Sequence, residues 1–136
     1  MSIGNVFLIA SSAMTAQSQR LNVVASNLAN VDSAASSTGG PYKAKQVVFS
    51  AQPVSGDKSS IGVRVARVLD DPRPPRLQFN PNHPLADARG YVTLPNVDAV
   101  EEMVNMISAS RAYQTNADVM NAAKTMAART ISLLQG

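Results

Sequence analysis

The chain of 136 residues contains no cysteine and no tryptophan, and aromatic residues make up only 4% of it. The absence of cysteine excludes disulfides and thiol chemistry and is compatible with any redox compartment. The apolar content of 45% therefore consists mostly of alanine, valine, leucine, isoleucine and methionine. This length accommodates about one domain, and such side chains provide little material for the core of a compact monomer.

Charge is scarce at the N-terminal end, where only Arg20 and Asp32 are charged among residues 1–40. Residues 1–40 sum to zero, residues 41–95 to +4 and residues 96–136 to −1, which together give the formal charge of +3. The mildly basic middle lacks the aromatic side chains on which nucleic-acid bases stack, so no nucleic-acid partner is expected. We expect its arginines to form a solvated strand face and ion pairs between subunits; these residues are Arg64, Arg67, Arg73 and Arg76, with Asp70, Asp71, Asp87 or Glu101 as partners.

The sequence also has little with which to build an active site. His83 is the only histidine and lies between Asn82 and Pro84, which predicts a loop histidine with local hydrogen bonds. There is no second histidine or cysteine for a zinc site, and no glycine-rich nucleotide-binding motif. We therefore expect no enzyme, no cofactor, no metal and no small-molecule substrate. The apolar run at residues 6–10 is too short for a cleaved signal peptide or a membrane span.

Two long stripes of mainly apolar residues occupy the ends of the chain, with gaps that alternate between four and three. The N-terminal stripe consists of Ile3, Phe7, Ala10, Met14, Gln17, Leu21, Val24, Leu28 and Val31. The C-terminal stripe consists of Met103, Met106, Ser110, Tyr113, Ala117, Met120, Lys124, Ala127, Ile131 and Leu134. This spacing predicts helices that pack along their length. The polar members Gln17, Ser110 and Lys124 either set the register of that packing or face solvent.

These signals predict an α+β, fibrous fold in four segments. An N-terminal helix is expected over residues 1–32, followed by a flexible joint at 33–40. All eight prolines fall within a β-rich region at 41–95, with strands at 45–49 and 61–65 and weaker candidates at 77–79 and 91–94. A C-terminal helix, capped by Asn96, is expected in the segment 96–136. The two helices should form one helical domain as an antiparallel coiled coil, with the Pro-rich β insertion between them.

The faces of the predicted helices that lie outside the two stripes, here called their backs, are unusual in composition. On them, serine, asparagine, threonine, glutamine and alanine replace the lysine and glutamate that normally solvate a helix. Such helices are suited to being covered on several sides, which indicates an assembly.

The segments 11–32 and 101–116 resemble the terminal signatures of the bacterial flagellar axial proteins, which form the rod, the hook and the hook-associated structures. The segments 41–49, 62–77 and 80–97 resemble the proximal-rod members of that family in the same order along the chain. The resemblance implies a structural subunit of the flagellar basal-body rod, located in the periplasm and exported by the flagellar type III apparatus without cleavage. It implies a tube of terminal helices around the export channel, with the β region outside.

The partners implied are other copies of the chain, other rod proteins, and the proteins of the MS ring and export gate at the rod base. The assembly interface is expected to include Ile3, Phe7, Met14, Gln17, Leu21, Val24, Asn27, Leu28, Asn30, Met103, Met106, Ile107, Tyr113, Asn116, Met120, Ile131 and Leu134. Three alternatives remain open. The first is a different rod subunit of the same family, and the second is a soluble coiled-coil adaptor, which would form a closed dimer. The third is a periplasmic binding module or an enzyme acting on the cell wall, which would need a polar pocket in residues 41–95, where the sequence offers no convergent acids.

Overall fold

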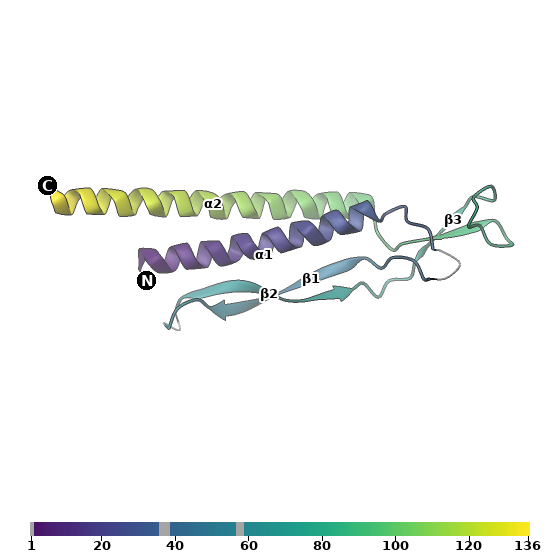
Figure 1. Ribbon diagram of the computed structural model, residues 1–136, viewed down its shortest axis with the longest axis horizontal. Coiled ribbons are helices and arrows are strands. Elements are labelled where there is room, and N and C mark those ends of the chain that lie inside the picture. Colours follow the sequence, from purple (N-terminus) through teal and green to yellow (C-terminus); the bar gives the residue numbers. More distant parts are fainter. Residues whose placement is uncertain (1, 36–38, 57–58) are drawn as a thin grey trace.

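The protein is elongated and consists of three layers over the middle of its length, as a computed structural model shows (Figure 1). The structure describes residues 2–35, 39–56 and 59–136. Its elements are α1 (Ile3–Ala29), β1 (Lys45–Pro53), β2 (Ile61–Asp70), β3 (Arg76–Phe79), β4 (Tyr91–Leu94) and α2 (Ala99–Gln135). Helix α1 lies between α2 on one side and the β1–β2 hairpin on the other. The predicted α+β class is confirmed.

Helix α1 begins where the sequence predicted it. Ser2 is the N-cap, and its Oγ accepts a hydrogen bond from the backbone N of Asn5 at 3.3 Å. The helix ends at Ala29, and Asn30 forms the C-cap, with its backbone N donating to carbonyls of the last turn. The 27 residues span about 40 Å.

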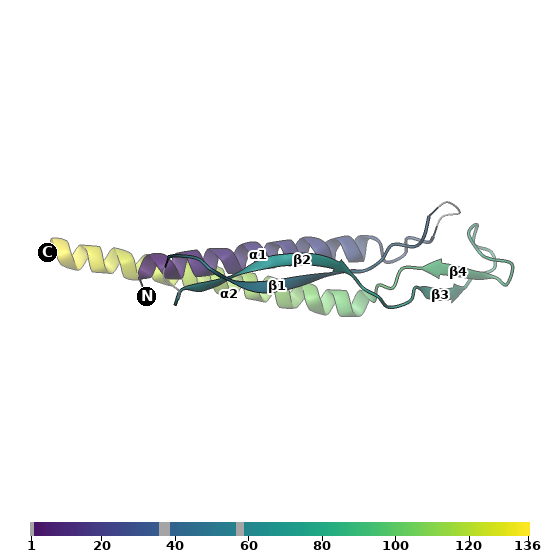
Figure 2. The same ribbon diagram turned by 90° about the horizontal axis from the view of Figure 1, so that it is seen from below.

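Helix α2 runs antiparallel to α1 and has 37 residues, about 55 Å, so its C-terminal part projects beyond the start of α1 (Figures 1 and 2). The prediction that Asn96 caps α2 is wrong. Asp98 is the N-cap, and its Oδ1 accepts hydrogen bonds from the backbone N of Val100 at 2.9 Å and of Glu101 at 3.1 Å. Asn96 cannot serve because its side chain is buried and bonded elsewhere, as described below.

Strands β1 and β2 form an antiparallel hairpin that is longer than predicted and lies along α1. The register shifts between Val48 and Phe49, which marks a β-bulge in β1. The apolar face of β2 is only partly covered, because Val63 and Val65 are half-buried while Ile61 is 53% exposed.

Near its turn, this hairpin is fixed against the first half of α1 by two hydrogen bonds. Asn5 Nδ2 donates to Ser60 Oγ at 2.8 Å, and the backbone N of Val63 donates to Ser12 Oγ at 3.1 Å.

Strands β3 and β4 form a second antiparallel hairpin at the end of the molecule where α2 begins (Figure 2). One side of this hairpin buries Val92 and Leu94. Gly90 has a φ of 84°, and a Cβ there would approach Phe79 Cε2 to 2.9 Å, so this position requires glycine. His83 makes the local hydrogen bonds that the sequence predicted, with its Nδ1 accepting from the backbone N of Leu85 at 3.1 Å.

The predicted joint at 33–40 lies partly outside the described residues, since residues 36–38 are not among them. Its first part is attached to the second hairpin, because the backbone N of Ala35 donates to the carbonyl of Thr93 at 3.0 Å. Residues 57–58 of the predicted loop between β1 and β2 are also not described. Within the described part of the chain, neither helix is long and apolar enough to cross a membrane.

We expect Gly62→Ala to destabilise the protein by about 1–3 kcal/mol, because a new methyl group must be accommodated in a packed contact. A Cβ at Gly62 would lie 2.4 Å from Ser12 Oγ and 2.5 Å from Val54 Cγ1, so the hairpin would have to move away from α1. The free energy of unfolding from urea titration measures the effect. Gly56→Ala is the control, because a Cβ there meets nothing within 4 Å; equal losses in the two variants would contradict this account.

Candidate functional site

Alanine residues are among the most buried side chains where the two helices meet. Ala10 of α1 is 2% exposed, and Ala109 and Ala123 of α2 are 0% and 1% exposed. Alanine allows the helix backbones to approach closely, and large side chains then fill the margins of the contact. Met14, Tyr113 and Met120, for example, line a shallow cavity between the two helices. The face by which α2 contacts α1 is thus defined by alanine and not by the predicted methionine and isoleucine positions.

The predicted interface residues fall into three groups by exposure in the single chain. The exposed group is Ile3, Met103, Ile107, Tyr113, Ile131 and Leu134. The half-buried group is Phe7, Met14, Gln17, Leu21, Leu28, Asn30, Met106, Asn116 and Met120. The buried group is Val24 and Asn27. The chain's own residues therefore cover Val24 and Asn27, while the first group is open to a partner.

The buried Asn27 side chain joins α1 to the start of β1. Its Nδ2 donates to the carbonyl of Lys45 at 2.9 Å, and its Oδ1 accepts from the backbone N of Lys45 at 2.9 Å. The same oxygen accepts from the hydroxyl of Tyr42 at 2.9 Å. Asn27 is 0% exposed, so these bonds replace water at both backbone groups of Lys45.

A second asparagine makes the corresponding connection from the start of α2. Asn96 Oδ1 accepts from the backbone N of Ala44 at 2.7 Å. Its Nδ2 donates to the carbonyls of Asp71 at 3.1 Å and Arg73 at 2.8 Å. The side chain that was predicted to cap a helix instead ties the segments before β1 and after β2 to the entrance of α2.

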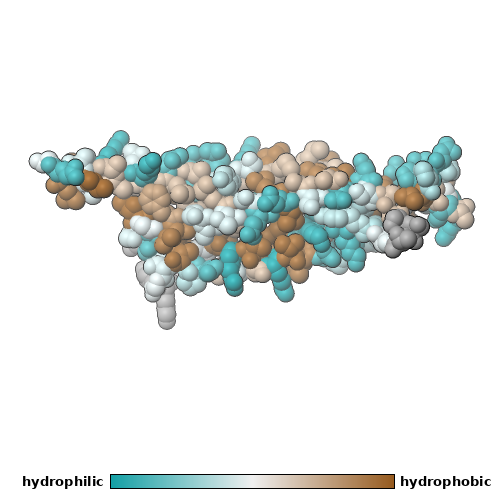
Figure 3. All heavy atoms as spheres, viewed as in Figure 1, coloured by the Kyte–Doolittle hydropathy of each residue, from teal (hydrophilic) through white to brown (hydrophobic). Residues whose placement is uncertain are grey.

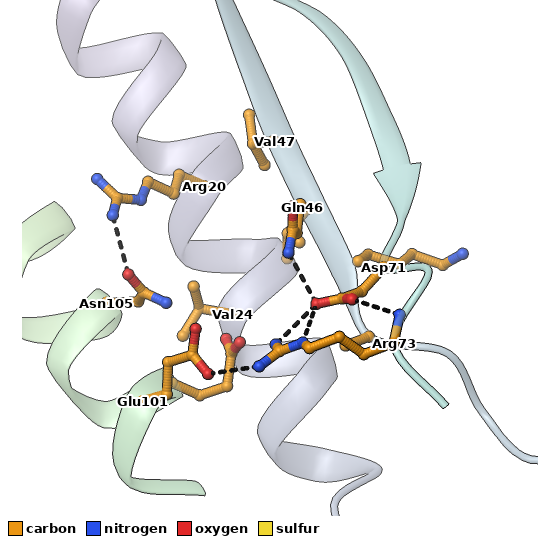
Figure 4. Close-up of a pocket in the computed structure, with 12 residues that line it drawn as sticks. Arg20, Val24, Gln46, Val47, Asp71, Arg73, Glu101 and Asn105 are labelled. Atoms are coloured by element: carbon orange, nitrogen blue, oxygen red, sulfur yellow. Dashed lines mark hydrogen bonds and ion pairs between the residues drawn. The ribbon is translucent and has the colours of Figure 1, made fainter. Parts of the chain in front are cut away.

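Asp71, Arg73 and Glu101 form an ion-pair cluster near the start of α2 (Figure 4). Arg73 contacts Asp71 Oδ2 at 2.7 Å and Glu101 Oε2 at 3.1 Å, and Gln46 Nε2 donates to Asp71 Oδ2 at 2.8 Å. The hydrogen bond from Arg73 holds the pKa of the buried Asp71 carboxyl below its ordinary value. The expected pairs between subunits are thus wrong for Arg73, whose pairs lie within the chain.

Arg76 also bonds within the chain, donating to the carbonyls of Pro95 and Val31 at 3.1 Å each.

Glu102 lies in the first turns of α2, beside a cavity of about 230 Å³ between α1, α2 and β1. It is 7% exposed, and among the described residues its Oε2 is buried without a hydrogen-bond partner. Burial raises the pKa of Glu102, and the neighbouring Glu101 raises it further. Asn27, Arg73 and Arg20 act in the opposite direction on this pKa. Arg20 itself donates to Asn105 Oδ1 at 3.1 Å.

The surface most suited to a partner is on α2, on the face opposite α1. Val100, Met103, Val104 and Ile107 follow the spacing i, i+3, i+4, i+7, which places them on one face of the helix. They are 70%, 54%, 61% and 56% exposed. Figure 3 shows hydrophobic residues gathered on this outer edge of the molecule. We call these four residues the α2 patch; Val100 and Val104 are absent from the sequence-based interface, although their spacing could have revealed them.

The part of α1 that faces solvent carries almost no charge. Its exposed polar positions are Ser11, Thr15, Ser18, Gln19, Asn22 and Ser26. The sequence interpretation attributed the uncharged backs of the helices to an assembly. The structure corrects this in part, since the chain's own hairpin covers one side of α1 through Ser12 and Asn5. The remaining strip still lacks the charges of an ordinary solvated helix.

Comparison with known proteins identifies the class to which this architecture belongs. Residues 7–34 match the family model described as "Flagella basal body rod protein", which covers most of α1. Residues 88–133 match the model described as "Flagellar basal body rod FlgEFG protein C-terminal", which covers β4 and most of α2. The paired terminal helices are thus the elements shared with flagellar basal-body rod proteins.

Curated relatives define the family more narrowly. The chain is 56% identical over 135 residues to the flagellar basal-body rod protein FlgC of Yersinia enterocolitica, covering 99% of this chain and 100% of the relative. It is 53% identical over 135 residues to FlgC of Salmonella typhimurium, with the same coverage, and 41% identical over 144 residues to FlgC of Borreliella burgdorferi, covering 94% of this chain and 95% of the relative. The chain belongs to the FlgC family and is a structural protein of the flagellar basal-body rod.

We expect Asn27→Ala to reduce the free energy of unfolding by about 2–4 kcal/mol, because both backbone groups of Lys45 and the Tyr42 hydroxyl lose their partner in a buried place. Urea titration followed by circular dichroism measures the loss. Asn22→Ala, at an exposed position of the same helix, is the matched control and should change stability little. A loss no larger than that of the control would show that the Asn27 bonds do not hold β1 to α1.

A pH dependence follows from Glu102. Its pKa in the folded state lies above the ordinary value of 4.5, so the folded protein binds more protons than the unfolded chain just above that pH. This carboxyl therefore makes stability fall as pH rises through the interval between the two pKa values. We expect Glu102→Gln to remove that decline and to be more stable than the wild type at neutral pH. Urea midpoints measured across this interval test it; parallel curves for the two proteins would contradict the assignment.

Proposed function

We propose that the chain polymerises through its terminal helices into the wall of a tube that surrounds the export channel and transmits torque. The observation that carries the proposal is the α2 patch, four large apolar side chains in a row on the side of α2 that no described part of the chain covers. A contiguous apolar face of this kind on a long helix is unfavourable in water and is typical of a surface for association. The family supports other rod subunits as the partners.

The architecture supports a stiff subunit. Helix α1 is held by α2 on one side and by a hydrogen-bonded hairpin on the other, so it cannot bend without disturbing two contacts. The asparagine bonds and the Asp71–Arg73–Glu101 cluster fix the end where both helices meet the β strands. Stiffness is the property that transmission of torque requires. We include in this proposal the helical domain of residues 1–32 and 96–136, with the helices as an antiparallel coiled coil.

The proposed interface differs from the predicted one at four positions. We retain its exposed and half-buried members, add Val100 and Val104, and omit Val24 and Asn27, which the chain itself covers. We further propose a location in the periplasmic part of the basal body, export by the flagellar type III apparatus without cleavage, and contacts with the proteins at the rod base. These follow from the family resemblance of the terminal segments and the β region.

The competing function is a soluble coiled-coil adaptor that forms a closed dimer. An adaptor helix would carry charged residues beside its contact face. The exposed strip of α1 has serine, threonine, glutamine and asparagine instead. This composition favours a helix that is covered again by neighbouring subunits.

We expect Ile107→Asp to abolish polymerisation while the subunit still folds. Ile107 is 56% exposed in the single chain, so a carboxylate there remains solvated until a partner covers it. Covering an unpaired charge costs about 3–5 kcal/mol, which raises the concentration needed for assembly by about 100-fold or more. Sedimentation of the assembled chain measures this, with circular dichroism to verify folding.

Asn121→Asp is the matched control, because it adds the same charge with little change of shape at an exposed position of α2 beyond the patch. Normal polymers from Ile107→Asp would refute the proposed interface, and a wild-type chain that forms only dimers would favour the adaptor.

A further inference from the structure

The cavity of about 230 Å³ between α1, α2 and β1 contains an acceptor that the chain leaves without a donor (Figure 4). Glu102 lines this cavity and is 7% exposed, and its Oε2 is buried without a hydrogen-bond partner among the described residues. Buried polar atoms are as a rule hydrogen-bonded, and buried charges are paired. The cavity is smaller than the pockets that hold small-molecule ligands, which measure about 300–1,000 Å³. Its size therefore suits a single side chain.

The basic side chains that line this cavity are already bonded to other groups. Arg73 is bonded within the ion-pair cluster, Lys45 Nζ contacts Asp70 Oδ1 at 2.7 Å, and Arg20 donates to Asn105. Burial raises the pKa of Glu102 although Arg73 and Arg20 act in the opposite direction. These cations therefore do not compensate for the loss of water around the carboxyl. A cation from outside the chain would supply the missing donor.

Arg111 is a cation without a partner in the single chain. Its side chain is exposed, and among the described residues its guanidinium forms no hydrogen bond or ion pair. It follows Ile107 by one turn of α2, so Arg111 continues the face on which Val100, Val104 and Ile107 of the α2 patch lie. A surface that covers the α2 patch therefore also meets this guanidinium, which offers several donors in one plane.

Glu102 and Arg111 cannot meet within one chain. They are nine residues apart on α2, which separates them by about 13.5 Å along the axis, and they lie on opposite sides of the helix because nine residues make about two and a half turns. An ion pair between them has to join two copies.

We propose that the cavity is the receptor for the Arg111 guanidinium of a neighbouring copy of this chain, whose α2 patch packs on the half-buried Val23 and Val47 that line the cavity. In this contact the guanidinium donates to Glu102 Oε2. A buried acceptor of one copy and an exposed donor of the next are thereby satisfied together. The inference rests on the proposed polymerisation and specifies one contact within it.

A double-mutant cycle tests the contact, with Glu102→Gln and Arg111→Gln alone and combined in the full-length chain. Sedimentation equilibrium gives the dissociation constant for association between copies. We expect either substitution alone to raise that constant by at least about 30-fold, because it leaves the opposite charge buried and unpaired. The combined variant should associate about as well as each single variant, because removing the second member of a broken pair costs little more.

Two controls separate this contact from other effects. Arg129→Gln removes the same charge from an exposed position about five turns further along the same face of α2, and its effect should add to that of Glu102→Gln. Urea titration of the unassociated chains should show additive effects of Glu102→Gln and Arg111→Gln on the free energy of unfolding, because the two side chains do not meet in one chain. If Glu102 acted only on the stability of the subunit, Glu102→Gln would not weaken association, since it is expected to stabilise the fold at neutral pH.

Additive effects of Glu102→Gln and Arg111→Gln on association, or wild-type association of either variant, would overturn the contact and leave the proposed function intact. An equally large overlap between Glu102→Gln and Arg129→Gln would also overturn it, by showing that the coupling is not specific to Arg111. A wild-type chain that stays monomeric at every concentration would overturn the proposed function and the contact together.

Discussion

Two buried side-chain amides hold this fold together. They form hydrogen bonds with backbone groups at the start of β1 that are not bonded by another strand. Asn27 of α1 bonds both backbone groups of Lys45, and Asn96 at the entrance of α2 bonds the backbone N of Ala44. Both helices are therefore tied to adjacent residues of one segment. Apolar packing between alanine-rich helices is weakly directional, so these amides determine where along α1 the hairpin and α2 are placed. Buried amides of this kind are costly when unpaired, which makes other registers unfavourable.

The elements of the fold were predictable because their signals are local. The spacing of the stripes and the proline-rich middle are each read over a few residues at a time, and all four strands and both helices lie where the sequence placed them, with β1 and β2 longer than expected. The cap of α2 was mispredicted because Asn96 and Asp98 are both good N-caps by residue type. The choice between them depends on Ala44, 52 residues away, which takes the side chain of Asn96. Sequence patterns carry no information about a partner at that distance.

The helix contact was harder to predict for a geometric reason. A stripe with a strict repeat of 3.5 residues drifts by about 20° per heptad around a straight helix. Of the two rows in the predicted α2 stripe, one lies on the exposed flank, as at Met103, and the other at the margin of the α1 contact, as at Met106 and Met120. The centre of the contact is formed by Ala109 and Ala123, which hydropathy ranks below methionine and isoleucine. The prediction relied on the largest apolar side chains. It therefore located the exposed surfaces of the helices better than the face of α2 that packs against α1.

The two ends of the subunit differ, because the polar connections between elements and the exposed apolar surfaces are unevenly distributed along it. The two buried asparagines and the ion-pair cluster lie at the end where both helices meet the strands, and the C-terminal part of α2 makes no such connection among the described residues. The open apolar surfaces are of three kinds: the α2 patch on the side, the exposed Leu77, Phe79 and Tyr91 of the β3–β4 hairpin at one end, and the exposed Ile131, Leu133 and Leu134 of α2 at the other. Covering all of them requires contacts both beside each subunit and at its two ends. The proposed polymer, in which every subunit has neighbours on several sides, provides both kinds of contact.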